Sequence, residues 1–418
     1  MCKIVVMDRL VGTYIFDPEM TQGKMIFLTG PRQVGKTTFA KNWLVSAGVA
    51  DTYFNWDDPS VLREYNRNPL FFHNIIDEKF KGKPVPLVFD EIHKHKNWRN
   101  ILKGVYDKDK ERMTLLVTGS ARLGLYRKSG DSLVGRYFSY QMFPLGLPEV
   151  VGNFSRVLDE GDGFSHGDAL VGLVRKVRSE TAETGLDRLL TFGGFPEPLL
   201  KGSPRFFRRW QAEYRSLLTK EDVRDLSRIQ DIRGIEQLVE MLPARVGSPL
   251  SVNSLREDMG YHHGTVMKWI DILKELYLVF TLRPWHRSVV RSIKKEPKLY
   301  FVDWSAIPDP AIRFENLCAV ALVRMAARLT ETGVGRFEVM FIRDKEKREV
   351  DFVLVDKQRP IALFEAKDAD LEIAPSGRYF SNKLGIPYYQ IVRHCKKAEA
   401  FPGNCFVIPA AKFFMLCG

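Results

Sequence analysis

The sequence predicts an α/β fold in which helices cover both faces of a parallel β-sheet. Short apolar runs with strand character alternate with segments of helical composition. The runs are 25–29, 52–56, 86–89 and 114–118, and the clearest helical segments are 37–47 and 98–106. This alternation favours a parallel sheet, because the connection between two parallel strands is usually a helix that packs on the sheet.

The chain of 418 residues is too long for one ordinary hydrophobic core. A glycine-rich, acidic segment with little apolar pattern, 159–168, predicts a loop and the first domain boundary. Beyond it we expect a mainly helical part, a pair of short helices followed by a strand, and a small second α/β domain. The boundaries that we expect for these four parts are 1–155, 156–245, 246–300 and 301–418.

Composition restricts the class of protein. The hydrophobic share of 45% and the charged share of 27% are typical of a globular chain. No apolar stretch approaches the roughly 18 residues of a membrane helix, and the first residues do not read as a signal peptide, so we expect a cytoplasmic protein without membrane contact. The five cysteines show no zinc-ligand spacing.

A glycine-rich loop follows the first apolar run and reads GPRQVGKT over residues 30–37. Between a strand and a helix, backbone N–H groups and the positive helix end point towards phosphates in such a loop. Lys36 would reach the β and γ phosphates, and the Thr37 hydroxyl would be a ligand of Mg²⁺. The ATP-binding residues expected are Gly30, Pro31, Arg32, Gln33, Val34, Gly35, Lys36, Thr37 and Thr38.

An acidic pair follows the apolar run at 86–89. Asp90, at the strand end, would hold Mg²⁺ through its water shell, and Glu91 would polarise the attacking water. The loop and the acidic pair together predict a Mg-dependent ATPase.

Several polar residues after these motifs are further candidates for the catalytic site. Thr118 or Ser120 would contact the γ-phosphate or the water, or would cap the next helix. Arg122 or Arg136 would stabilise transition-state charge, in this chain or from a neighbouring subunit, or would serve only a surface role. The sequence leaves these alternatives open.

These motifs resemble those of prokaryotic AAA-like P-loop ATPases with a winged helix and a C-terminal restriction-endonuclease-like domain, mostly of unknown physiological role. The resemblance covers nearly the whole chain and implies a RecA/AAA-like core, a winged-helix middle and a nuclease-like end. One departure is Arg313, which replaces the usual glycine before Phe-Glu-Asn. The matching segments are 30–38, 89–93 with Trp98, 118–120, 135–137, 143–145, 193–197 and 314–316.

The middle of the chain is basic, with 19 Lys and Arg against 12 Asp and Glu over residues 201–300. In a winged helix, 265–276 would be the recognition helix, with His262, His263 and Lys268 near the DNA groove. A packing or partner-binding role for this helix is the alternative. A phosphate-backbone patch, or a solvated loop, would be formed by Arg283, His286, Arg287, Arg291, Lys294, Lys295 and Lys298.

The last part predicts a helix at 314–327 and strands at 339–342, 350–355 and 361–364, with a turn near Arg359. In a hairpin of the last two strands, Asp351 and Glu365 can converge on a second Mg²⁺, with Lys367 on the same face. This pattern resembles the Asp...Glu-x-Lys core of restriction-endonuclease-like nucleases, and the resemblance adds Glu315. The alternative is a salt-bridged cluster without nuclease chemistry.

The sequence therefore leads to three functional hypotheses. The first is ATP hydrolysis coupled to domain rearrangement on DNA. The second is an ATP-dependent signalling or defence switch that acts through a protein partner or a homo-oligomer. The third is an ATP-gated, metal-dependent nuclease.

Overall fold

A computed structural model describes residues 7–119, 133–155, 157–158, 161–177, 180–223, 231–286 and 295–418. The chain divides into two compact units. One runs from Arg9 to Phe143, and the other contains Pro144 to Gly418 together with the first residues of the chain. Each unit is described by itself below.

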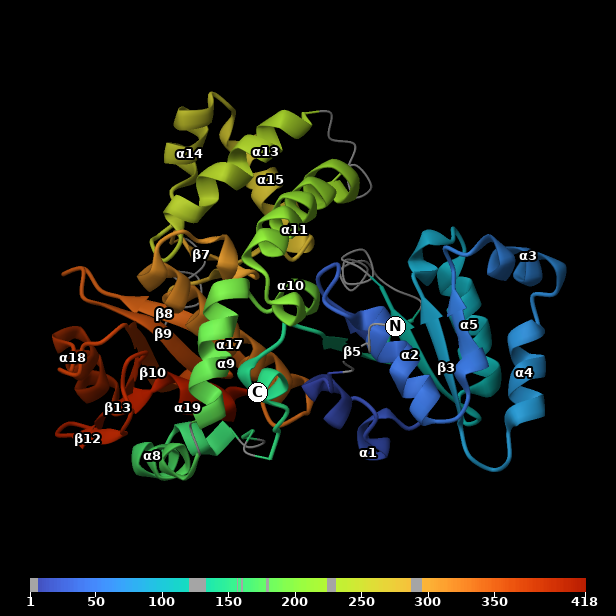
Figure 1. The fold of residues 1–418 in the computed structure, drawn as a ribbon, viewed down its shortest axis with the longest axis horizontal. Helices are drawn as coiled ribbons and strands as arrows, with labels where there is room; N and C mark the ends of the chain where they lie inside the picture. The colour runs from blue at the N-terminus through green and yellow to red at the C-terminus, as the bar shows by residue number, and fades with distance from the viewer. Residues whose placement is uncertain are drawn as a thin grey trace. The chain divides into compact units, whose positions relative to one another are not determined.

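The first unit contains a five-stranded sheet, in which every strand pair is parallel (Figure 1). The strand order is β2-β3-β4-β1-β5, so the strand before the glycine-rich loop lies inside the sheet. The strands are β1 (Met25–Thr29), β2 (Tyr53–Asn55), β3 (Val85–Asp90), β4 (Met113–Thr118) and β5 (Tyr137–Gln141).

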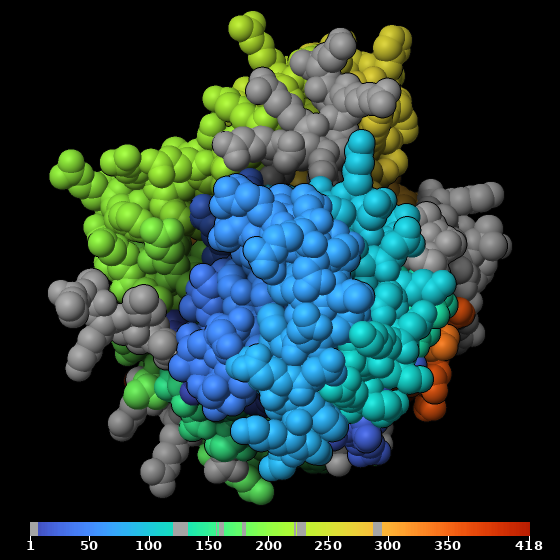
Figure 2. All heavy atoms as spheres, turned by 90° about the vertical axis from the view of Figure 1, so that its right-hand side faces the viewer, coloured from blue at the N-terminus to red at the C-terminus, as the bar shows by residue number. Residues whose placement is uncertain are grey.

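Helices cover both faces of this sheet. Alternate strand residues such as Phe27 and Phe89 pack in one core with side chains of α3, α4 and α5, and α2 contacts β3 and β4. Figure 2 shows one side of this unit, where the light-blue and cyan segments that include α3, α4 and α5 lie side by side. The helices are η1 (Leu10–Thr13), α1 (Pro18–Thr21), α2 (Lys36–Ser46), η2 (Ala50–Thr52), α3 (Pro59–Arg67), α4 (Phe71–Lys79), η3 (Ile92–Lys94) and α5 (Trp98–Asp109).

The second unit begins with a helical region. Its helices are α7 (Leu147–Val151), η5 (Gly161–Phe164), α8 (Gly167–Lys176), α9 (Glu180–Phe192), α10 (Pro196–Lys201), α11 (Pro204–Leu217), η6 (Leu218–Asp222), α13 (Ile232–Met241), η7 (Leu242–Arg245), α14 (Val252–Met259) and α15 (His263–Glu275). An antiparallel pair follows α15, formed by β6 (Val279–Leu282) and β7 (Lys298–Phe301). The helix expected at 265–276 is α15, and its two ends lie within two residues of the predicted bounds.

A mixed six-stranded sheet completes this unit, in the order β12-β13-β11-β10-β9-β8. β8, β9 and β10 are antiparallel neighbours, whereas β10, β11 and β13 are parallel. The strands are β8 (Phe337–Arg343), β9 (Glu349–Asp356), β10 (Arg359–Lys367), β11 (Tyr388–Val392), β12 (Glu399–Phe401) and β13 (Cys405–Pro409). The accompanying helices are η8 (Trp304–Ala306), α17 (Pro310–Glu331), α18 (Pro375–Leu384) and α19 (Ala410–Cys417).

Two local predictions in this sheet domain need correction. The turn between β9 and β10 lies at Lys357 and Gln358, which both have positive φ, and Arg359 already belongs to β10. α17 begins four residues before Phe314, because Asp309 accepts hydrogen bonds from two first-turn N–H groups and Pro310 occupies the first helical position. Arg313 lies inside this first turn and donates to the carbonyl groups of Ile307 and Pro308.

Among the described residues, no helix has the length and apolar character needed to cross a membrane.

Candidate functional site

The glycine-rich loop of the first unit lies between the end of β1 and the start of α2. Gly30 and Gly35 have φ of 147° and 103°, conformations that favour glycine. A Cβ on Gly30 would lie 2.3 Å from the carbonyl oxygen of Met142, so a larger residue does not fit there. Lys36 begins α2, and its Nζ donates to the carbonyl oxygens of Gly30 and Pro31 at 2.9 and 2.7 Å. The loop is therefore folded around its own lysine.

Asp90 is the buried last residue of β3 and accepts hydrogen bonds from three side chains. Thr37, at the start of α2, and Tyr53, on β2, both donate to Oδ2, at 2.8 and 2.6 Å. Thr118, at the end of β4, donates to Oδ1 at 2.5 Å. β3 and β4 are parallel neighbours, and Asp90 lies opposite Thr118 at their carboxyl ends. Tyr53 begins β2, two positions before the residue that lies opposite Asp90.

Glu91 directly follows Asp90 and has an uncommon backbone conformation for a non-glycine residue, with φ of 59°. Its backbone N–H donates to the Thr118 carbonyl oxygen at 2.9 Å. Its carboxylate lies 3.4 Å from His93 Nε2 and 3.8 Å from Lys94 Nζ. Burial raises the pKa of Glu91, the Lys94 charge lowers it and the Asp90 charge raises it, with a net increase. A raised pKa suits a proton acceptor.

The side chains at this edge of the sheet suit Mg²⁺ and a polyphosphate. Thr37 and Asp90 supply the hard oxygen atoms that Mg²⁺ prefers, and Thr37 is exposed while bonded to Asp90. The missing Cβ of Gly30 lets the loop backbone pack closely against the Met142 carbonyl oxygen.

The structure does not bring all the predicted catalytic residues together. Ser120 and Arg122 lie outside the described residues. Arg136 precedes β5, and its carbonyl oxygen accepts from the N–H of Met25, the first residue of β1, whereas the P-loop follows the last residue of that parallel strand. Arg136 is thus at the opposite end of the sheet from the P-loop and pairs with Asp107 at 3.1 Å. This position contradicts the expectation that Arg136 acts in the ATP site of its own chain.

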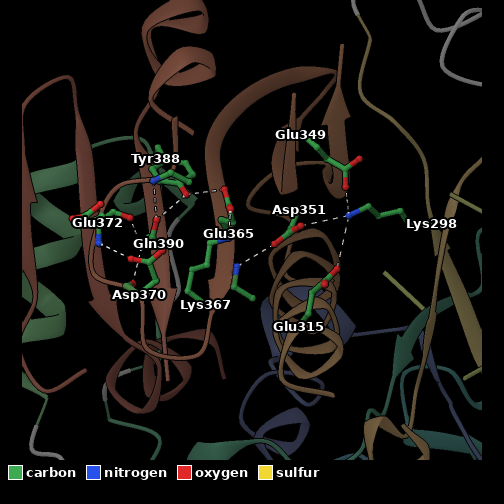
Figure 3. Close-up of polar contacts among 12 residues, drawn as sticks. Lys298, Glu315, Glu349, Asp351, Glu365, Lys367, Asp370, Glu372, Tyr388 and Gln390 are labelled. Atoms are coloured by element: carbon green, nitrogen blue, oxygen red, sulfur yellow. Dashed lines mark hydrogen bonds and ion pairs between the residues drawn. The ribbon is translucent and has the colours of Figure 1, made fainter. Parts of the chain in front are cut away.

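The predicted nuclease-like residues of the second unit form two ion-paired groups (Figure 3). The first surrounds Lys298 of β7, whose side chain is 1% exposed. Its Nζ lies 2.6 Å from Glu349, 3.4 Å from Asp351 and 3.8 Å from Glu315. Tyr300 donates a further hydrogen bond to Glu315, at 2.8 Å.

The second group surrounds Glu365 on β10. Lys367 Nζ lies 2.7 Å from Glu365 Oε1, and the Tyr388 hydroxyl donates to Oε2 at 2.8 Å. Asp351 lies next to this group, because it accepts a hydrogen bond from the N–H of Ala366 at 3.2 Å. The pairing of β9 with β10 therefore places Asp351 beside the strand segment that carries Glu365 and Lys367.

Burial and neighbouring charges change the proton affinity of the Lys298 group. Burial and the charge of Asp351 raise the pKa of Glu315 to about 8, against the opposing effect of Lys298. Burial alone would lower the pKa of Lys298, but Asp351, Glu315 and Glu349 outweigh it and raise the pKa. In the part of the chain that the structure describes, no group of three or more His, Cys, Asp or Glu side chains is arranged to hold a metal ion.

The basic residues of the middle region differ in their exposure to solvent. His262, His263 and Lys268 are exposed at the start of α15, and Arg283 and Lys295 are also exposed. Arg287, Arg291 and Lys294 lie outside the described residues, whereas His286 is half-buried. Lys298 is not part of a surface patch, because it is buried among carboxylates.

Sequence reasoning missed two residues that the structure connects to these sites. Tyr53 begins the short strand β2 and belongs to no motif, so its contact with Asp90 depends on strand order. Lys298 also begins a strand, directly before Leu299, Tyr300 and Phe301. A lysine at the start of an apolar strand was the one available signal that it is buried.

Comparisons with known proteins agree with this geometry in the first unit. Residues 22–151 match the family described as "AAA domain", and residues 183–307 match "Domain of unknown function (DUF8612)". The uncharacterized protein MJ1637 of Methanocaldococcus jannaschii is 24% identical over 98% of this chain and 88% of its own length. The uncharacterized protein Rv2008c of Mycobacterium tuberculosis is 24% identical over 67% of this chain and 54% of its own length.

Among solved structures, a variant of RuvB from Thermotoga maritima is similar at 15% identity, over 62% of this chain and 81% of that chain, with a TM-score of 0.25. A likeness at this score carries no functional argument. The family match and the parallel five-stranded sheet agree with each other independently of it. Residues 22–151 therefore form an AAA-type P-loop domain, a class that binds and hydrolyses ATP.

Proposed function

We propose that this chain is a Mg-dependent ATPase whose nucleotide site is formed by residues 30–38 with Asp90, Glu91 and Thr118. The observation that carries the proposal is the convergence of the Thr37 and Thr118 hydroxyl groups on the Asp90 carboxylate, beside the glycine-rich loop. Bound Mg²⁺ would neutralise phosphate charge. Thr37 and Asp90 hold the metal, Lys36 binds the phosphates and Glu91 accepts a proton from water.

The test is a Lys36→Ala variant, which removes the ammonium that would bind the β and γ phosphates. We expect its ATP turnover with Mg²⁺ to fall by about a hundredfold or more, because a fixed charge that stabilises the transition state is lost. Lys110→Ala is the matched control, since Lys110 is an exposed lysine of the same unit. Turnover that survives in Lys36→Ala would contradict the proposal.

We further propose that the chain consists of an ATPase domain over 1–155, a helical lid or connector over 156–245, a winged helix over 246–300 and a restriction-endonuclease-like domain over 301–418. The order of α14 and α15 followed by the antiparallel β6–β7 pair supports the winged-helix assignment. ATP hydrolysis would change the relative positions of these parts. An arginine from a neighbouring subunit would complete the ATPase site in a homo-oligomer.

We propose DNA as the partner of the middle region, with a protein partner as the alternative. The exposed Lys268, Arg283 and Lys295 support binding to a phosphate backbone. The measurement is ATP turnover with double-stranded and single-stranded DNA at low and physiological salt. Stimulation that weakens as salt rises supports DNA, because neutralised phosphates release counterions. Turnover that is indifferent to DNA favours a signalling or defence switch that acts through a protein.

A second candidate function is ATP-gated nuclease activity of the C-terminal part. The observation in its favour is the proximity of Asp351, Glu365 and Lys367 on neighbouring strands. Asp351→Ala should then abolish DNA cleavage while ATP turnover remains. Absence of cleavage by the wild-type protein with either Mg²⁺ or Mn²⁺ would exclude this function.

A further inference from the structure

Tyr53 contacts the carboxylate oxygen of Asp90 that also bonds to the P-loop threonine. The Tyr53 hydroxyl and the Thr37 hydroxyl donate to Asp90 Oδ2 at 2.6 and 2.8 Å. Tyr53 is the first residue of β2, the edge strand beside β3, and belongs to neither the glycine-rich loop nor the acidic pair. Its aromatic ring reaches Asp90 from two positions before Asn55, the residue that pairs with Asp90 in the strand register.

A second contact fixes the orientation of the Tyr53 ring. Lys41 Nζ lies 4.7 Å from the centroid of this ring, a distance at which an ammonium is attracted to an aromatic face. Lys41 follows Thr37 by four residues on α2, so the two side chains lie on the same face of the helix. Two side chains of α2 therefore contact this pair: Thr37 bonds to Asp90, and Lys41 lies over the Tyr53 ring.

Three donors hold the Asp90 carboxylate in one orientation. Thr118 binds Oδ1, while Thr37 and Tyr53 share Oδ2. Hydrogen bonds to an ionised carboxylate are roughly twice as strong as neutral ones, so each donor restricts rotation of the group. If Thr37 is also a metal ligand, Tyr53 is the second donor that holds Oδ2 of Asp90.

We propose that Tyr53 is a positioning residue for the magnesium ion of the ATPase site, an inference that rests on the proposed function. Tyr53 acts through Asp90 and does not contact the nucleotide. Hydrogen-bond partners of metal-binding groups typically change metal affinity about 10- to 100-fold when they are removed. The loss should lie at or below the lower end of this range, because Thr37 and Thr118 still hold Asp90.

Tyr53→Phe tests the proposal, because it removes the hydroxyl and keeps the ring over Lys41. With a nonhydrolysable ATP analogue present, the affinity for Mn²⁺ measured by electron paramagnetic resonance should fall about three- to tenfold. The Mg²⁺ concentration that gives half-maximal turnover should rise by the same factor, while kcat at saturating Mg²⁺ stays within about twofold.

Two further variants separate the proposed role from general damage to the fold. Tyr106→Phe removes a tyrosine hydroxyl of the same unit that donates to the Gly23 carbonyl oxygen at 2.8 Å, and it should leave Mn²⁺ affinity unchanged. Lys41→Gln retains the Tyr53 hydroxyl but frees the ring, so it should weaken Mn²⁺ binding less than Tyr53→Phe. Thermal melting of each variant checks the fold.

The outcomes distinguish failure of the inference from failure of the ATPase proposal. Unchanged Mn²⁺ affinity in Tyr53→Phe, with wild-type ATP turnover intact, overturns the role of Tyr53 alone. A fall in kcat with unchanged metal affinity also overturns it, because the loss would then lie in the chemical step. Wild-type protein that neither binds the nucleotide nor hydrolyses it overturns the ATPase proposal, and the inference with it.

Discussion

A buried lysine is stable in this protein because carboxylates surround it. Lys298 lies within 4 Å of Glu315, Glu349 and Asp351, and the charges of Glu349 and Asp351 offset the loss of its hydration. Three ionised carboxylates around one ammonium would leave excess negative charge. The pKa of Glu315, raised to about 8, means that this carboxyl holds a proton at neutral pH.

Because Glu315 holds this proton in the folded state, the stability of the protein should fall as the pH rises. Because the pKa of Glu315 is about 8 in the folded chain and near 4.5 in the unfolded chain, the folded state binds more protons between these values. The contribution of Glu315 to stability is present below its pKa in the unfolded chain and is lost as the pH rises towards 8. Glu315→Gln keeps a neutral side chain at all pH values and should therefore be less sensitive to alkaline pH.

Urea denaturation at about pH 5 and about pH 9 measures this difference. The stability of Glu315→Gln relative to the wild type should increase by roughly 4 kcal/mol from the lower to the higher pH. Glu338→Gln is a control, because Glu338 is an exposed carboxyl of β8 in the same sheet. Parallel pH profiles for wild type and Glu315→Gln would show that Glu315 ionises normally.

At the scale of elements, the loop between β1 and α2 depends on one close approach of the backbone. Gly30→Ala would place Cβ against the Met142 carbonyl oxygen, 2.3 Å away, at a φ of 147°. The loop must then shift, and we expect a loss of about 1–3 kcal/mol in stability together with weaker ADP binding.

Gly48→Ala provides the comparison for this change. Gly48 also has positive φ, 73°, but nothing lies within 4 Å of an added Cβ. This variant should lose about 1 kcal/mol from backbone strain while ADP affinity stays unchanged. Calorimetric titration and thermal melting measure both quantities. Equal ADP affinity in the two variants would show that the Gly30 contact does not shape the nucleotide site.

The sequence predicted elements best where apolar periodicity was strong. Four strands of the first sheet appear within a residue or two of the predicted runs, because buried parallel strands consist of nearly continuous apolar residues. β5 was missed, since Tyr137–Gln141 lies at the sheet edge and is mostly half-exposed. β11 and β13 were also missed, although both are fully buried parallel strands of the second sheet.

The difference between local patterns and long-range contacts also applies to the functional sites. The P-loop and the acidic pair are local motifs that could be recognised in the sequence. Tyr53 and Lys298 reach their partners through pairings between distant segments, with 37 residues separating Tyr53 from Asp90 and 53 separating Lys298 from Asp351. Spacing along the chain gives no indication of such contacts. Arg136 shows the converse, because nearness in sequence to β4 did not place it near the phosphate loop.

At the scale of the whole molecule, the two compact units have separate hydrophobic cores. A ligand that binds only the first unit should therefore stabilise that unit. Mg-ADP at about 100 times its dissociation constant should stabilise it by about 2.7 kcal/mol. In scanning calorimetry we expect one transition to move to higher temperature while the other stays in place.

The Lys36→Ala variant is the control for this measurement, since it should abolish the shift. If Mg-ADP moved both transitions equally, the two units would unfold as one cooperative block. If it moved neither in the wild-type protein, the ATPase proposal would lose its support.

Three carboxyl groups share the ammonium of Lys298, and this sharing couples the effects of mutations at the four positions. Glu315, Glu349 and Asp351 all contact the same ammonium, so the effects of their substitutions should not be additive. Loss of the lysine alone would leave buried negative charge, whereas joint replacement of the lysine and a carboxylate by apolar residues would be tolerated better. Substitutions at these four positions are therefore expected to be correlated as this sequence evolves.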